Sequence, residues 1–164
     1  LPLRSSLDTT LTMHNISFHV VARGDSLAVT PSGYKKNNKV ETTLITGAPV
    51  KAEIADLDRD NWPELLVYVV SKDNARRGTV VAYSSNDDRS MSPIEFVGFA
   101  KDANVNRGYS GHDSFAVENG ALVQRFPVME NGKPTGKTRQ VQYKLLVGEE
   151  AILRVEKVTE ADSR

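Results

Sequence analysis

Two apolar runs joined by a polar loop decide how this chain folds: Leu65-Leu66-Val67-Tyr68-Val69-Val70 and, after Gly78, Thr79-Val80-Val81-Ala82-Tyr83. The first run is apolar at every position, which is typical of a central strand that is covered on both faces. β-Branched and aromatic residues dominate both runs, as they do in strands generally. The sequence therefore predicts a β-hairpin in the middle of a sheet.

Strand and turn signals recur about every ten residues on either side of this hairpin. Apolar and polar residues alternate within 16–22, 50–54 and 141–147, and a last strand is expected at 152–158. Such alternation predicts strands that turn one face towards solvent. The pair Asn119-Gly120 favours positive φ angles, and it predicts a second hairpin between 115–117 and 122–126.

Convincing helical periodicity is missing, and the polar stretches 86–92 and 100–108 have room for no more than a short helical turn. We predict an all-β fold, an antiparallel β-sandwich or closed barrel of about 8–11 short strands. The 164 residues contain neither a linker nor a repeat, so residues 1–164 are expected to form a single β domain. Its core should run from about residue 10 to about residue 158, with frayed termini. No apolar run is long enough for a membrane-spanning helix.

The balance of charges and the absence of cysteine narrow the functional classes. Lysine and arginine number 21, and so do aspartate and glutamate, which argues against a nucleic-acid partner because phosphate binding needs a basic surplus. Without cysteine, disulfide bonds and thiolate zinc sites are excluded. The chain starts with Leu1-Pro2 rather than methionine, so either the chain was trimmed or a signal peptide was removed.

The segment Asp56-Leu57-Asp58-Arg59-Asp60-Asn61-Trp62-Pro63-Glu64, the acidic loop, precedes the first apolar run. If the loop turns tightly, its four carboxylates can converge on one hard cation such as calcium: Asp56, Asp58, Asp60 and Glu64. The segment resembles the calcium loops before strands in integrin-type β-propellers, with Asn61 where those loops usually have glycine. Because the motif occurs once, a propeller is excluded. The alternative is an Asx-rich turn whose side chains cap backbone amides.

The loop Arg107-Gly108-Tyr109-Ser110-Gly111-His112-Asp113 is a second candidate site. It contains serine, histidine and aspartate, but a catalytic triad needs these residues to converge from separate elements rather than follow one another along a loop. We therefore expect no enzymatic activity. The loop is either a structural turn in which His112 pairs with Asp113, or a recognition loop with an exposed Tyr109.

The loop Ser71-Lys72-Asp73-Asn74-Ala75-Arg76-Arg77-Gly78 joins the two apolar runs and is the third candidate site. Polar groups at the tip of a rigid hairpin are well placed to enter a partner's cleft, and arginine is suited to bidentate contacts with carboxylates. The alternative is a solvated hairpin tip. The polar loop 130–139 has the same two interpretations.

Three groups of segments, taken in order, carry a family resemblance. They are Ala55-Asp56-Leu57-Asp58 with Pro63-Glu64-Leu65-Leu66-Val67-Tyr68-Val69; Gly108-Tyr109 and Gly111-His112-Asp113 with 115–117 and 122–127; and Lys133-Pro134-Thr135-Gly136 with 138–145. In this order they resemble the PliI family, the bacterial periplasmic inhibitors of invertebrate-type lysozyme. The likeness extends from about residue 50 to about residue 158.

This resemblance implies a β-sandwich in the periplasm, its signal peptide removed, that blocks the active-site cleft of a lysozyme by inserting protruding loops. Lysozyme clefts hold two carboxyl groups, which hydroxyl, amide or guanidinium groups on a preformed loop could contact at a small entropic cost. The expected contacts come from the two polar loops: Ser71, Asn74, Arg76, Arg77, Tyr109, Ser110 and His112. No cofactor is required in this interpretation.

The hairpin tip departs from the family, whose members carry a serine, glycine and tyrosine motif in a projecting loop at this place. Residues 72–77 contain neither glycine nor tyrosine, and the triplet Ser32-Gly33-Tyr34 lies far upstream. A second interpretation therefore stays open, in which the chain is a calcium-stabilised envelope domain that binds a glycan or a protein and inhibits nothing.

Overall fold

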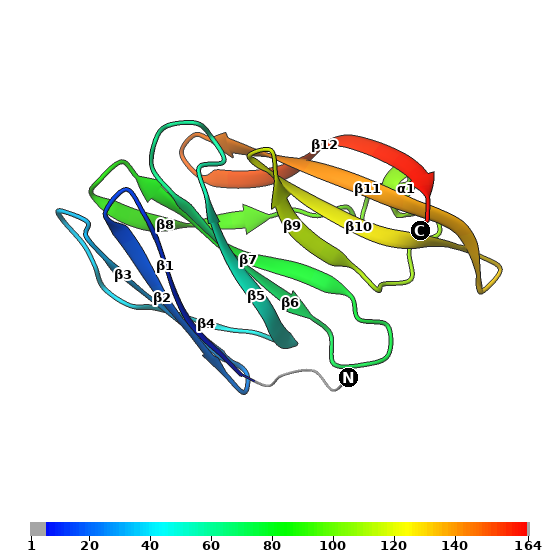
Figure 1. Cartoon of the computed structure of the whole chain (residues 1–164), viewed down its shortest axis with the longest axis horizontal. Helices are drawn as coiled ribbons and strands as arrows, with labels where there is room; N and C mark the ends of the chain where they lie inside the picture. Colours follow the sequence, from blue (N-terminus) through cyan, green and yellow to red (C-terminus); the bar gives the residue numbers. More distant parts are fainter. Residues whose placement is uncertain (1–5, 164) are drawn as a thin grey trace.

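The computed structural model describes residues 6–163, in which twelve strands and one helical turn are found (Figure 1). The strands are β1 (Ser6–Met13), β2 (Ile16–Arg23), β3 (Ser26–Ser32), β4 (Glu41–Leu44), β5 (Ala48–Ala55), β6 (Glu64–Val70), β7 (Gly78–Asn86), β8 (Ser90–Phe96), β9 (Ser114–Glu118), β10 (Ala121–Glu130), β11 (Lys133–Val147) and β12 (Ala151–Asp162). The helix α1 (Ala103–Asn106) is capped by the Asp102 carboxylate, which accepts a hydrogen bond from the backbone of Asn104. The predicted all-β fold is confirmed.

The strands form a four-stranded sheet in the order β1-β2-β3-β4 and an eight-stranded sheet in the order β5-β6-β7-β8-β12-β11-β10-β9. One pair in the larger sheet, β8 with β12, is parallel, so the expectation of purely antiparallel pairing is corrected there. The larger sheet is nearly closed. The Glu53 carboxylate on β5 accepts hydrogen bonds from Tyr68 on β6 and from the backbone of Val117 on β9, and it thereby links the two edge strands.

Strand β6 explains why one stretch is apolar at every position: all seven of its residues are buried. Successive side chains point to opposite faces of a strand. Leu65, Val67 and Val69 pack into the core shared with the four-stranded sheet. Leu66 and Tyr68 pack into a second core inside the curved eight-stranded sheet. Both predicted hairpins are present, β6 with β7 and β9 with β10, and Asn119 and Gly120 have positive φ angles.

The ends of the chain differ from expectation. Residues 159–162, expected to be frayed, extend β12 along β11, and the Lys137 ammonium lies 2.6 Å from the Asp162 carboxylate. The loop expected at 130–139 is a tight turn at Asn131-Gly132 inside the β10–β11 hairpin. The N-terminal residues, on which the expectation of a removed signal peptide rests, lie outside the described residues. In the part of the chain that is described, no helix has the length and apolar character to cross a membrane.

Candidate functional site

The loop 107–113 lies against the loop 71–78, which forms the tip of the β6–β7 hairpin (Figure 1). The backbone N–H of His112 donates to the carbonyl oxygen of Ala75 over 2.7 Å. At Gly111 the chains approach so closely that a Cβ atom would lie 1.9 Å from the same carbonyl oxygen. Residues 71–78 and 107–113 therefore form one surface, which we call the composite loop surface.

The carboxylate of Asp113 links the two loops of the composite loop surface through hydrogen bonds. Its Oδ2 atom accepts hydrogen bonds from the backbone N–H of Gly78 at 2.9 Å, the Tyr109 hydroxyl at 2.7 Å and the Gln124 amide at 2.8 Å. Its Oδ1 atom is buried without a hydrogen-bond partner. Burial raises the pKa of this carboxyl above its ordinary value, against the opposing effect of the three donors. Among the described residues no hydrogen bond or ion pair joins His112 to Asp113, so the alternative in which these two side chains pair is not found.

The predicted contact residues divide into exposed groups and groups that shape the loops. Asn74, Arg77 and His112 are exposed. The Ser71 hydroxyl donates to Asp73 at 2.7 Å and accepts from the backbone of Arg77 at 2.8 Å, so it serves the conformation of its own loop. Arg76 and Ser110 are half-buried.

Tyr109 is half-buried, whereas one of the two interpretations of this loop expected it to be exposed. Its hydroxyl is bonded to Asp113, and its ring packs edge-on against Phe99 and Phe126 with centroid distances of 5.0 and 4.9 Å. The guanidinium carbon of Arg77 lies over the same ring, 5.4 Å from its centroid. Among the described residues no hydrogen bond joins the side chains of Ser110, His112 and Asp113 into a triad.

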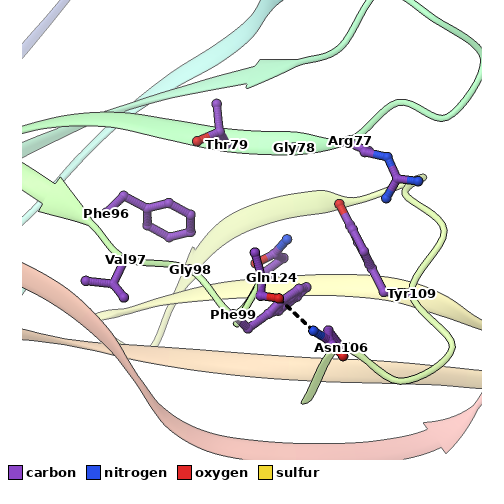
Figure 2. A pocket seen from close by; sticks show the side chains of 11 residues that line it. Arg77, Gly78, Thr79, Phe96, Val97, Gly98, Phe99, Asn106, Tyr109 and Gln124 are labelled. Carbon is purple, nitrogen blue, oxygen red and sulfur yellow. Dashed lines mark hydrogen bonds between the residues drawn. The ribbon is translucent and has the colours of Figure 1, made fainter. Parts of the chain in front are cut away.

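Beside the composite loop surface lies a cavity of about 480 Å³, which we call the aromatic pocket (Figure 2). It lies between the start of β7, the segment after β8, helix α1 and β10, and its lining includes Arg77, Phe96, Phe99, Asn106, Tyr109 and Gln124. Sequence reasoning found only Arg77 and Tyr109 of these. Phe96, Phe99 and Gln124 lie in or just after strands and look like ordinary core residues, and Asn106 lies in the short helix α1, so no local pattern marks them.

The acidic loop contains two residues with a left-handed backbone conformation. Asn61 has a φ of 72° and Arg59 a φ of 59°, and asparagine adopts this left-handed conformation more readily than most residues. One carboxylate oxygen from each of the four acidic residues lies within 4.8 Å of the other three. Convergence of the four side chains is therefore found, and hard carboxylate oxygens in this number suit a calcium ion.

The carboxylates of the acidic loop also accept hydrogen bonds from backbone N–H groups within the same loop. Asp56 accepts hydrogen bonds from the backbone N–H groups of Asp60 and Asn61, as an Asx-rich turn would. Glu64 is fully buried and accepts from the backbone of Leu57 at 2.8 Å. Since a carboxylate oxygen can accept more than one bond, this turn geometry and cation binding are compatible.

Two carboxyl groups of the acidic loop have raised pKa values, because they are buried and lie close to other carboxylates. Burial, with the neighbouring aspartates, raises the pKa of Glu64 to about 8. Burial and hydrogen bonding to Asp60 raise the pKa of Asp58 to about 6, and the Oδ1 atom of Asp58 is buried without a partner. A divalent cation would remove this repulsion and use the unpartnered oxygen, so the residues present fit such an ion.

Comparison of the chain with protein-family models, with curated proteins and with solved structures gives no match.

Proposed function

We propose that this protein binds a partner protein through the composite loop surface, and that the partner is a lysozyme, with the invertebrate type as the first candidate. The observation that carries the proposal is the rigid joining of the two loops by Asp113 and by the close approach of Gly111 to Ala75. A preformed surface loses little conformational entropy on docking. The choice of lysozyme, and export to the periplasm, follow from the family resemblance.

The exposed side chains suit a cleft lined with carboxyl groups. Arg77 offers a planar guanidinium for bidentate contact, and Asn74 and His112 offer further donors on the same surface. Lysozyme-type glycosidases hold two carboxyl groups in their cleft, which flank the bond that is cleaved. A guanidinium inserted there would block the substrate and pair with these groups. Ser71 and Tyr109, whose hydroxyls are bonded internally, support the surface instead of contacting the partner.

Inhibition of cell-wall lysis tests this proposal. In a turbidity assay with invertebrate-, chicken- and goose-type lysozymes, excess protein should suppress lysis by the invertebrate type. Arg77→Ala should weaken the inhibition about tenfold or more, as expected for an arginine near the centre of an interface.

Arg23→Ala is the matched control, because Arg23 is exposed at the end of β2 in the other sheet, and it should inhibit like the parent protein. Full lysis by all three lysozymes in the presence of excess protein would contradict the proposal. Inhibition that Arg77→Ala leaves unchanged would contradict the assigned surface.

A second candidate function is a calcium-stabilised envelope domain that binds a glycan or protein without inhibiting a lysozyme. It is favoured by the convergence of four carboxylates within 4.8 Å and by the unpartnered Asp58 oxygen. Asp56, Asp58, Asp60 and Glu64 would hold the ion. Its contribution would be structural, since the acidic loop leads directly into the buried strand β6.

Thermal melting with calcium and with a chelator tests this candidate. At calcium concentrations roughly 100 times Kd, the melting temperature should rise by about 5 °C or more. The rise should be larger at pH 9 than at pH 6, because the ion competes with the proton on Glu64, whose pKa is about 8. Asp58→Asn should abolish the rise, whereas Asp25→Asn, at an exposed turn, should not. Equal melting temperatures in calcium and chelator exclude the site.

A further inference from the structure

The aromatic pocket has features that protein docking does not use. Figure 2 shows Arg77 and Tyr109 on one side of the pocket and Phe96 on the other, with Phe99 and Gln124 between them. Phe99 is buried in the core of the eight-stranded sheet, so the inner wall of the pocket is a rigid aromatic surface. A volume of about 480 Å³ falls within the range of small-molecule sites.

The two amide side chains that line the pocket already form hydrogen bonds within the protein. The Gln124 amide donates to Asp113 and accepts from the Tyr143 hydroxyl. The Asn106 amide donates to the carbonyl oxygen of Ala100. These groups therefore stabilise the wall and have limited capacity for a ligand.

Among the described residues the side chains of Arg77 and Thr79 have no such internal hydrogen bond, and Arg77 is the single charged residue of the lining. Its guanidinium is held by the face of the Tyr109 ring at 5.4 Å, and among residues 6–163 no carboxylate forms an ion pair with it within 4.0 Å. The nearest carboxylate behind the wall, that of Asp113, accepts its three hydrogen bonds from Gly78, Tyr109 and Gln124 and none from Arg77. A cation fixed at the edge of an aromatic cavity is complementary to an anion that carries an apolar body.

We propose that the aromatic pocket binds a small organic carboxylate with a flat, aromatic body. The carboxylate pairs with the Arg77 guanidinium, and the ring lies among Phe96, Phe99 and Tyr109. Aromatic rings pack favourably edge-on, as the pocket's own rings do. Arg77 serves both this pocket and the proposed lysozyme contact, so the two ligands would compete for it, but binding of the small molecule is tested with no lysozyme present.

Titration of 3-phenylpropionate into the full chain, followed by calorimetry and by backbone amide shifts in NMR spectra, tests the proposal. Saturable binding with a Kd below about 1 mM is expected. The largest shifts should fall at residues 77–79, 96–100 and 124. Propionate, which lacks the ring, and 3-phenylpropan-1-ol, which lacks the charge, should bind about tenfold more weakly or worse.

Variants separate the pocket from general charge effects. Arg77→Gln should weaken 3-phenylpropionate binding about tenfold, and Arg77→Lys should weaken it less, because the ammonium keeps the charge but loses the planar fork. Arg107→Gln, an exposed position outside the pocket lining, should bind like the parent. An unchanged melting temperature of Arg77→Gln shows that the variant is folded. Absence of saturable binding, equal affinity for the alcohol, shifts located elsewhere or unchanged affinity of Arg77→Gln would each overturn the proposal.

Discussion

Replacing Asp113 by alanine is expected to lower the free energy of unfolding by about 3 kcal/mol. The substitution leaves three donors without their acceptor: the backbone N–H of Gly78, the Tyr109 hydroxyl and the Gln124 amide. Unsatisfied donors in a buried site cost more than the bonds contribute when formed, so the loss should exceed that of an ordinary surface change. Urea unfolding measured by circular dichroism gives the value.

Two further variants define the cause. Asp113→Asn keeps one acceptor oxygen and should lose about half as much stability as Asp113→Ala. Asp25→Ala removes a carboxylate from an exposed turn and should stay within about 0.5 kcal/mol of the parent. If Asp113→Ala unfolds like Asp25→Ala, Asp113 does not hold the loops together.

The same residue gives a pH dependence of defined sign. Burial raises the pKa of Asp113 in the folded protein above its value in the unfolded chain, so the folded state binds the proton more tightly. The part of the stability that is linked to the raised pKa of Asp113 is therefore fully present in acid and is lost as the pH rises from the ordinary aspartate pKa of about 4 through the raised value. The free energy of unfolding of Asp113→Asn should not decline in this way when it is measured across the same pH range.

Gly111→Ala is expected to be similarly damaging, with a loss of about 3 kcal/mol, because it acts on the contact between the loops. The new Cβ atom would lie 1.9 Å from the Ala75 carbonyl oxygen, and the residue has a φ of +89°. The loops must separate to relieve this contact, which removes the hydrogen bond from His112 to Ala75. Hydrogen exchange at the His112 amide should accelerate along with the loss of stability.

The chain contains a matched control for this prediction. Gly136 has a φ of +81°, but a Cβ atom there has open space around it. Gly136→Ala should therefore show only the backbone strain, about 1 kcal/mol. Equal losses for the two variants would assign the effect of Gly111→Ala to backbone conformation and would contradict close docking of the loops.

Some features of the candidate site could be predicted from the local sequence. The left-handed Asn61 and the convergence of carboxylates in the acidic loop follow from residues within nine consecutive positions, because such a loop is closed by its own backbone. The aromatic pocket could not be predicted from the local sequence. Phe96, Phe99 and Gln124 look like core residues, and only the departure of the chain from the sheet after β8 leaves space beside them.

The sequence alone determined the fold class and the central place of β6. Unbroken apolarity over Leu65–Val70 requires cover on both faces, and period-two alternation then supplies two cores. It located both polar loops but not their contact. Gly78 and Asp113 are 35 residues apart, and their hydrogen bond depends on the order of strands in the sheet. Strand order follows from packing of the whole chain, so the tertiary structure alone decided that two separate loops form one surface and that Asp113 is half-buried between them.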